Sequence, residues 1–512
     1  MVHKELSSKK IALILAGLMT GLFLSALDST IVGTAMKSIV DDLKDIQSYS
    51  WPFTIYMLAS TAAIPVFGGL ADIYGRKPIL LTGITIFLSG SLLCGTSQSM
   101  LQLIIFRGLQ GIGGGILVSS VFTVVADLFE PAKRGKYMGI VTSMYGLASI
   151  TGPLLGGLIT DNLSWRWVFY VNIPVGLAAI VIILSAMPNF KSGNERNSVD
   201  FPGTFVLMLI LVPMLLAFSL AGSDYSWGSF QIIGMFAFAT VMLPLFIYVE
   251  SRASNPIVPL ALFKNRAIGI SFLIGFLTNA LMFAAIMYIP YYVQGILGST
   301  ATTSGAVTTP MMLGLLLASN VAGLLISKFN KCKVLTISAF VLMTVGAALL
   351  STLGIASRYY EVIVFMVIFG LGIGINMPVA NITAQNAAPR EQVGAVTSVV
   401  QFFRNTGGTV GSAIYGAIMT RSMNQGFLKL DLSQVPDNVK NLLQNPRIIT
   451  DVQAVNQIKA HVPQAYLSYF DDILLKAKTV LSGSIHDVFL FCMFVAAAGI
   501  IIAFFFKEVR SV

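Results

Sequence analysis

The sequence predicts an all-α membrane protein with fourteen spanning helices, arranged as two six-helix bundles with two further helices inserted between them. Three observations predict this class. Of the 512 residues, 55% are hydrophobic and only 11% are charged, which leaves too little polar surface to cover a soluble globule. Apolar runs of about 20 residues recur along the chain, and that is the length a helix needs to cross a bilayer. Two short motifs recur at a common offset, which indicates a duplicated chain.

The spans can be placed in order from the apolar runs. The first run follows Lys9-Lys10, and we interpret it as an uncleaved helix because no cleavage site and soluble domain come after it. Polar and glycine-rich stretches separate the later runs. The expected spans lie near residues 11–35, 51–71, 79–97, 100–124, 138–160, 167–187, 202–221, 229–249, 267–290, 305–326, 333–354, 361–385, 393–420 and 485–506.

The distribution of basic residues predicts the orientation. An even number of spans puts both termini on one side, and nineteen Lys and Arg lie on the termini and on the loops of that side. The short loops opposite hold only four, namely Lys37, Lys44, Arg166 and Arg358. Since basic residues favour the cytoplasmic face, we expect a multi-pass protein of the cell membrane with cytoplasmic termini. The net charge of +10 then reflects topology and gives no reason to expect a nucleic-acid partner.

A polar turn between the second and third spans supplies the first repeated motif. It reads Gly68-Gly-Leu-Ala-Asp72-Ile-Tyr-Gly75-Arg76-Lys77-Pro78, and we expect Asp72 to accept hydrogen bonds from a neighbouring helix N-terminus. A degraded copy lies 255 positions later, with Gly323 at the place of Gly68 and Ser327 at that of Asp72. The same offset places Gly152-Pro153-Leu-Leu-Gly156 on Gly407-Gly408-Thr-Val-Gly411.

The repeat divides the chain into three parts. Residues 1–188 are expected to form the first bundle, and residues 189–266 a linker with the two inserted helices. Residues 267–512 are expected to form the second bundle, including a long external loop at 421–484. Cys94, Cys332 and Cys492 are odd in number and scattered, so neither a disulfide framework nor a metal site is expected. We expect a monomer without a cofactor.

Asp28 and Arg107 are the candidate coupling residues. Asp28 lies in an apolar helix, where a charge costs at least about 2.5–3.5 kcal/mol on insertion scales. A low dielectric favours the protonated carboxyl, so Asp28 is either a proton or cation carrier or a structural acid. Counted from the cytoplasmic side, Asp28 lies at about 26 Å and Arg107 at about 30 Å, so we expect them to interact, directly or through water or Gln110. The alternatives are a proton-linked pair and a static buried ion pair.

Glycines on the fifth span are candidates for a conformational role. Gly146, Gly152, Gly156 and Gly157 make a smooth helix face, and Pro153 removes a backbone hydrogen bond. We interpret this face as a rocking seam between the bundles, with ordinary tight packing as the alternative. By the repeat, Gly407 and Gly411 belong to the counterpart face.

The C-terminal bundle supplies the candidate substrate contacts. Arg404 has no acidic partner in the expected C-terminal spans, so it binds either a substrate carboxylate or backbone carbonyls. Aromatic and amide side chains suit flat apolar compounds, and we expect Tyr291 and Tyr292 near the outer mouth. With Arg404, the candidates are Phe276, Asn279, Phe283, Tyr288, Tyr291, Tyr292, Gln294, Asn320, Asn376, Asn381, Gln385, Gln401 and Phe402.

The motifs together resemble those of a known family, the fourteen-helix drug:proton antiporters of the major facilitator superfamily. The residues that carry the resemblance are residues 68–78, Arg107-Gly-Leu-Gln-Gly111-Ile-Gly113, Gly152-Pro153-Leu-Leu-Gly156-Gly157, Leu27-Asp28-Ser-Thr30 and Trp165-Arg-Trp167-Val-Phe-Tyr-Val-Asn172-Ile-Pro174. The resemblance implies the major facilitator fold, with bundles related by a pseudo-twofold axis. In this superfamily the motif on the fifth span marks antiporters.

The sequence therefore predicts a proton-coupled antiporter that exports lipophilic drugs or other small molecules by alternating access. Two alternatives remain: an exporter specific for one metabolite, fatty acid or antibiotic on the same scaffold, and a non-transporting receptor or scaffold. An enzyme is not expected, because neither a His/Glu metal cluster nor a nucleophile with a base occurs in the spans.

Overall fold

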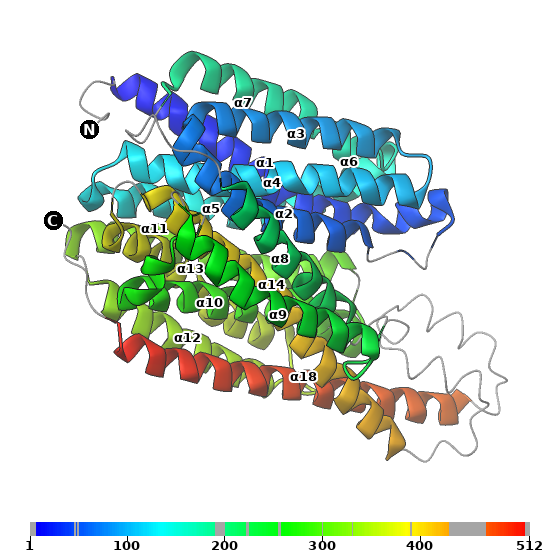
Figure 1. Cartoon of the computed structure of the whole chain (residues 1–512). Helices are drawn as coiled ribbons and strands as arrows, with labels where there is room; N and C mark the ends of the chain where they lie inside the picture. The colour runs from blue at the N-terminus through cyan, green and yellow to red at the C-terminus, as the bar shows by residue number, and fades with distance from the viewer. Residues whose placement is uncertain are drawn as a thin grey trace.

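A computed structural model describes residues 7–45, 48, 51–189, 200–221, 225–253, 256, 258–299, 301–329, 331–389, 392–429 and 467–506. Within these residues the chain is helical, as predicted, apart from short connections and one isolated bridge. Figure 1 shows long helices running roughly parallel, with α1 beginning and α18 ending at the same end of the molecule. The first seven are α1 Ser8–Leu43, α2 Trp51–Tyr74, α3 Arg76–Thr96, α4 Met100–Leu128, α5 Pro131–Asn162, α6 Trp167–Tyr170 and α7 Asn172–Ala186.

The second part of the chain continues the same pattern. Its elements are α8 Phe201–Leu220, α9 Phe230–Arg252, the 3-10 helix η2 Leu260–Lys264, α10 Arg266–Tyr291, the π-helix η3 Tyr292–Ile296, α11 Ala301–Phe329, α12 Cys332–Ser351, α13 Tyr359–Ala387, α14 Val393–Leu428 and α18 Leu467–Phe504. Thirteen helical segments of the described residues are long and apolar enough to cross a membrane. The remaining predicted span, 393–420, corresponds to α14, whose Gln401, Arg404 and Asn405 make it less apolar.

Three predicted boundaries differ from the structure. The external loop expected at 421–484 is shorter, because α14 continues to Leu428 and α18 already begins at Leu467; residues 430–466 lie outside the described part. Helix α1 is 36 residues long, against 25 predicted. The sixth span is divided at Val171 into α6 and α7. Helical hydrogen bonding continues beyond the apolar segment in the first two cases, so hydropathy alone gives the wrong ends.

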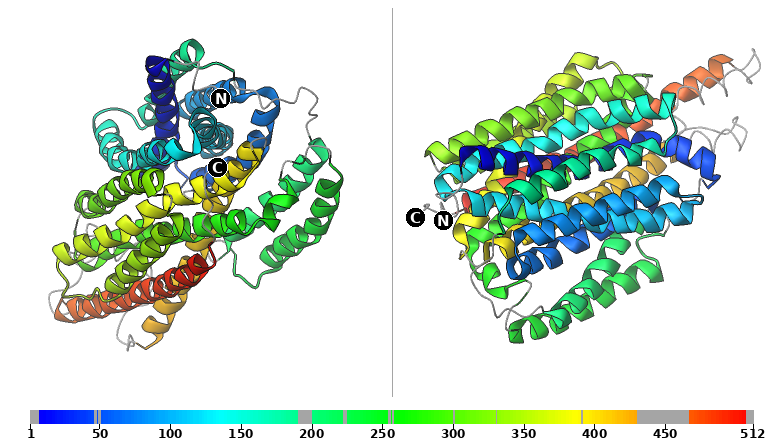
Figure 2. Two further views of the ribbon diagram at one scale, coloured as in Figure 1. Left: turned by 90° about the vertical axis from the view of Figure 1, so that its left-hand side faces the viewer. Right: turned by 90° about the horizontal axis from the view of Figure 1, so that it is seen from above.

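The two halves lie side by side, with the inserted helices on one flank (Figure 2). Helices α1 to α7 pack mainly with one another, and so do α10 to α18, while α5 with α11 and α2 with α14 join the halves. The inserted α8 packs on α9 and contacts both α2 and α14. Its Ser219 hydroxyl donates to Thr54 of α2 at 3.2 Å. The boundaries expected at residues 188 and 266 remain predictions.

Candidate functional site

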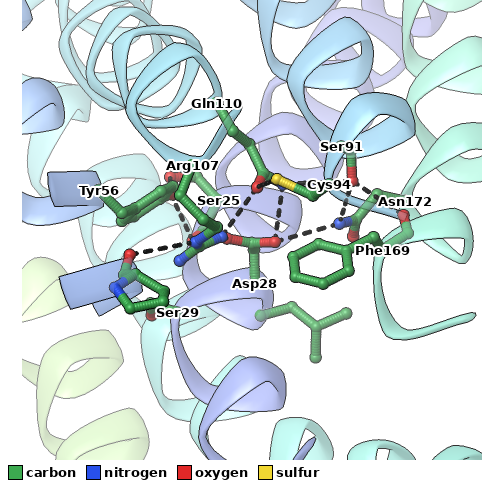
Figure 3. A network of polar contacts seen from close by, with 12 residues as sticks. Ser25, Asp28, Ser29, Tyr56, Ser91, Cys94, Arg107, Gln110, Phe169 and Asn172 are labelled. Carbon is green, nitrogen blue, oxygen red and sulfur yellow. Dashed lines mark hydrogen bonds and ion pairs between the residues drawn. The ribbon is translucent and has the colours of Figure 1, made fainter. Parts of the chain in front are cut away.

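Asp28 and Arg107 form a buried ion pair in the first half (Figure 3). Asp28 projects from α1 and Arg107 from α4, and both side chains have 0% exposure. The Arg107 Nη1 donates to Asp28 Oδ2 and also to Gln110 Oε1 at 2.8 Å, while its Nε donates to the Pro52 carbonyl at 3.4 Å. The contact that the sequence predicts is therefore present, whereas its role in proton coupling remains a prediction.

Three polar side chains complete a network around the carboxylate (Figure 3). Gln110 Nε2 donates to Asp28 Oδ1 at 2.8 Å, and Asn172 Nδ2 donates to the same oxygen at 3.3 Å. The Ser91 hydroxyl accepts from both amides, at 3.2 and 3.0 Å, and donates to the Phe169 carbonyl at 2.8 Å. Donors from α4 and α7 therefore converge on one buried carboxylate, and both of its oxygens accept hydrogen bonds.

Aromatic rings cover the guanidinium of the pair. The Arg107 Cζ lies 4.2 Å from the centre of the Tyr56 ring and 5.9 Å from that of Phe169. Tyr56 is itself fixed by its hydroxyl, which donates to the Ser25 carbonyl at 3.3 Å. Cation–π contact stabilises the buried guanidinium, and exclusion of water strengthens its attraction to the Asp28 carboxylate.

The sequence reasoning assigned no role to Ser91, Asn172 or Tyr56. Asn172 lies in the motif at residues 165–174, within an apolar span. A polar amide at that position could have indicated a buried hydrogen-bonding role. A buried amide in a spanning helix needs a hydrogen-bond partner, which Asp28 and Ser91 supply.

We expect Arg107→Leu to lower thermal stability far more than the double substitution Asp28→Asn with Arg107→Leu. The single change leaves a buried carboxylate without its cation, which costs about 3–5 kcal/mol, whereas the double change removes both charges. Thermal unfolding in detergent measures the difference. The control is Arg166→Leu, which breaks the 2.8 Å pair with the half-exposed Asp42 and is expected to cost about 0–1 kcal/mol. Equal losses for Arg107→Leu and the double variant would contradict coupling within the pair.

Only Gly75 separates α2 from α3, so the rest of the glycine-rich motif at residues 68–78 lies within these two helices. Gly75 has φ of 95°, a conformation that favours glycine, and lets the chain reverse between Tyr74 and Arg76. Arg76 has 1% side-chain exposure and pairs with Asp72 Oδ1 at 2.5 Å and with Asp127 Oδ2, on α4, at 2.7 Å. The neighbouring Lys77 Nζ donates to the Leu184 carbonyl of α7 at 2.8 Å.

The same turn connects the two halves of the molecule. Asp72 accepts a hydrogen bond from the Ala395 backbone N–H in the first turn of α14, as predicted for a neighbouring helix N-terminus. A Cβ added at Gly68 would overlap the Ser398 side chain of α14. Ser398 also shares a hydrogen bond with Ser119 of α4 at 2.8 Å. Helices α2 and α14 are thus in close contact at the end of the molecule where α1 begins.

The degraded copy makes the equivalent contact between α11 and α5. Ser327, at the place of Asp72, accepts a hydrogen bond from the Lys136 backbone N–H near the start of α5, at 2.9 Å. Gly323, at the place of Gly68, packs against the backbone of Gly135. A hydroxyl therefore takes the place of the carboxylate in a contact with a backbone N–H of the opposite half, and the geometry agrees with the repeat that the sequence predicts.

The face of α5 that carries Gly152 and Gly156 does not lie between the two halves. A Cβ at Gly152 would overlap Thr30, and one at Gly156 would overlap Thr34, so this face of α5 packs against α1 of the same half. Gly157 has no neighbour within 4 Å, and the Pro153 side chain lies outside the described set. The placement between bundles was wrong for Gly152 and Gly156 in this conformation, because α5 meets α11 nearer its start. Gly146, closer to that start, does pack against Met312 and Leu316 of α11. Gly407 and Gly411 pack on α10 in the same manner, as the counterpart face should.

Arg404 contacts the opposite half through an aromatic side chain. Its Nη2 donates to the Tyr145 hydroxyl of α5 at 2.7 Å, and its Cζ lies 4.8 Å from the Tyr145 ring centre and 5.5 Å from that of Phe122. The Nη1 has no hydrogen-bond partner within the described residues. The expected binding of a substrate carboxylate by Arg404 remains a prediction.

Most of the predicted amides gather around Arg404 on α10, α13 and α14. The Arg404 carbonyl accepts from Asn279 Nδ2 at 2.8 Å, and Gln401 Nε2 donates to Asn381 at 2.7 Å. Gln385 Nε2 donates to Thr397 at 3.1 Å and to the Phe122 carbonyl of the other half at 3.4 Å. Buried carbonyl oxygens without a partner in the described residues belong to Asn376, Gln385 and Gln401. Buried acceptors of this kind, of which Gln401 lies one turn before Arg404 on α14, suit a polar group of a ligand.

The remaining predicted contacts are less well placed. The backbone of Phe276 packs on Gly407, and the ring of Phe283 packs on Gly408, within the second half. Asn320 donates to the Leu316 carbonyl of its own helix at 2.8 Å. Tyr292 is fully buried and donates to the Gly354 carbonyl, in the connection between α12 and α13, at 2.7 Å. The neighbouring Tyr291 is half-buried beside Tyr288, and the place of both tyrosines near an outer mouth remains a prediction.

The expectation that the second half has no acid in its spans was also wrong. Asp487 lies within the apolar part of α18 and accepts a hydrogen bond from Ser422 of α14 at 2.6 Å. It is exposed and stands near one edge of the expected span 485–506, which explains why hydropathy did not distinguish it.

The fold and this site define a multi-pass, all-helical membrane protein built from two similar halves that meet around buried polar clusters. A sequence profile described as Major Facilitator Superfamily matches residues 18–412. The chain belongs to the major facilitator superfamily, a family of membrane transporters.

Individual relatives agree. The chain is 40% identical to the Multidrug transporter protein MdtP of Bacillus subtilis (strain 168), over 99% of this chain and 95% of the relative. It is 36% identical to Multidrug resistance protein 3 of the same organism, over 98% and 96%. The fold resembles that of the human organic anion transporter MFSD10, with a TM-score of 0.60, 14% identity and coverage of 95% and 99%. It also resembles the proton:xylose symporter XylE, with a TM-score of 0.61, 13% identity and coverage of 98% and 97%.

Proposed function

We propose that the chain is a proton-coupled antiporter that exports lipophilic small molecules across the cell membrane, with both termini in the cytoplasm. The observation that carries this proposal is the Asp28 carboxylate, fully buried in a spanning helix and held by Arg107, Gln110 and Asn172. A transporter that uses a proton gradient needs a group of this kind, because the proton must be held away from water while the protein changes conformation. The multidrug names of its relatives support a broad range of lipophilic substrates.

The contacts between the halves support alternating access. Helices α2 and α14, and α5 and α11, are in close contact at the end where α1 begins. With cytoplasmic termini, this conformation is closed toward the cytoplasm. Protonation of Asp28 removes the charge that Arg107 attracts, so the contacts that fix α1 to α4 weaken and the equilibrium between conformations shifts. The polar cluster around Arg404 faces Tyr145 of the other half and is the proposed place of substrate contact.

Transport in liposomes tests the proposal. Purified protein is reconstituted with an imposed pH gradient, and a fluorescent lipophilic drug is followed. We expect the drug to accumulate against its own gradient and to redistribute when a protonophore collapses the pH gradient. Liposomes without protein control for passive pH-driven partitioning of the drug. Accumulation that is unaffected by the protonophore would contradict proton coupling.

An exporter specific for an acidic metabolite is the second candidate. It is favoured by Arg404, a buried cation whose Nη1 lacks a hydrogen-bond partner within the described residues. Competition distinguishes the candidates. A specific carrier is inhibited by lipophilic carboxylates and not by cationic drugs of the same size, whereas a multidrug exporter is inhibited by both.

A further inference from the structure

We propose that a groove between α1, α5 and α11 binds the headgroup of an anionic phospholipid and that this lipid stabilises the conformation seen here. The groove encloses about 510 Å³ at the end of the helices where α1 begins. Its walls come from the first turns of α1 and α5 and from the last turns of α11. The inference concerns a ligand other than the exported substrate and does not depend on proton coupling.

The charged side of the groove comes from α5. Lys133 and Lys136 both line it and are exposed, and their spacing of three residues puts them on one face of the helix. The residues lining the groove include no carboxylate, so nothing within it neutralises the two ammonium groups. Lys9 and Lys10, exposed in the first turn of α1, add further positive charge to the same end of the helix. Two or more cations at a membrane surface attract anionic lipid headgroups.

The other walls are apolar. Ile11, Ala12 and Leu15 have helical spacing and line the groove from α1, and Leu324 lines it from α11. Leu324 is 52% exposed, so its side chain is available to a ligand on the membrane side. A small soluble anion would contact the lysines and leave these side chains uncovered. A phospholipid can occupy both the charged and the apolar side of the groove, with its phosphate near Lys133 and Lys136 and its acyl chains along Leu15 and Leu324.

The position of the groove links lipid binding to conformation. Two of its walls belong to the first half and one to the second, and between them Gly135 of α5 packs directly on Gly323 of α11. The Lys136 backbone N–H also donates to Ser327, a lining residue of α11, at 2.9 Å. A movement that separates α5 from α11 opens the groove and removes one wall. A ligand that needs all three walls therefore favours the conformation in which they are together.

Native mass spectrometry of the full-length protein with defined lipids tests the inference. We expect bound phosphatidylglycerol to exceed bound phosphatidylcholine for the unsubstituted protein. The double substitution Lys133→Gln with Lys136→Gln is expected to weaken phosphatidylglycerol binding about thirtyfold. The matched control is Lys331→Gln with Lys333→Gln, which removes the same charge from the start of α12, outside the groove, and is expected to retain the lipid.

Three results would overturn the inference. If both double variants retain phosphatidylglycerol equally, the groove is not its binding site. If both lose it equally, the lipid is attracted to the basic face in general. Displacement of phosphatidylglycerol by millimolar inorganic phosphate would show that the site recognises the anion alone. As a test of the apolar wall, Leu324→Gln leaves every charge in place and is expected to weaken lipid binding, since the acyl chains lose a contact. Unchanged binding by that variant would count against a lipid.

Discussion

Asp28→Asn is expected to reduce pH-gradient-driven accumulation of drug in liposomes to the level of protein-free liposomes. Asparagine nearly preserves the size of the side chain and can still accept from Gln110 and Asn172, but it cannot gain or lose a proton. The variant leaves the Arg107 cation unpaired, which is expected to lower stability by about 3–5 kcal/mol. In the protein that folds, we expect exchange of labelled for unlabelled drug to be retained, since exchange requires no net proton movement. Loss of accumulation with retained exchange is the combination that assigns coupling to Asp28.

Asp42→Asn is the matched control. Asp42 is a second carboxylate near the end of the same helix, outside the candidate span, where its pairing with Arg166 lowers the pKa of its carboxyl. Removing that charge is expected to leave drug accumulation close to that of the unsubstituted protein. If Asp28→Asn accumulates drug as well as this control, Asp28 is not the proton carrier. If Asp28→Asn also loses exchange, its role is in folding or drug binding rather than coupling.

The general architecture was predictable because lipid imposes strict demands on composition. Apolar length predicted fourteen spans, and thirteen helical segments of the described residues are long and apolar enough to cross a membrane. The motif copies at residues 68–78 and 323–331 indicated two similar halves. The exact ends were not predictable in the same way. Beyond the bilayer, helices α14 and α18 are held by hydrogen bonds and by contacts with each other, neither of which leaves a hydropathy signal.

The pairing within the site was partly predictable. Asp28 and Arg107 were matched because a charge inside a membrane needs a partner at the same height, and height follows from counting residues. Ser91 and Asn172 were not found, because their contact with Asp28 depends on how α3 and α7 are rotated about their axes. The partner of Gly152 was missed for a similar reason. Glycine spacing shows that another helix approaches closely, and it does not show which helix this is.

Gly68→Val is expected to prevent the closed contact between α2 and α14. The added side chain would overlap Ser398, and overpacking of this kind costs about 1–3 kcal/mol, which corresponds to a shift of roughly tenfold to a hundredfold between conformations. Spin labels at Tyr74 and Phe329, which are exposed on α2 and α11 at this end, report the separation of the halves. The three buried cysteines are replaced first. We expect the distance to lengthen and transport to fall.

Gly157→Val serves as the matched control, since it places the same side chain in a helix at a position with no neighbour within 4 Å. It is expected to change neither the distance nor the transport rate, because valine alters helix propensity equally at both positions. An unchanged distance in Gly68→Val would mean that the α2–α14 contact does not hold the halves together. A longer distance with undiminished transport would mean that closure at this end is not a step of the cycle. The two measurements therefore separate the conformational role of the glycine-rich turn from its contribution to transport.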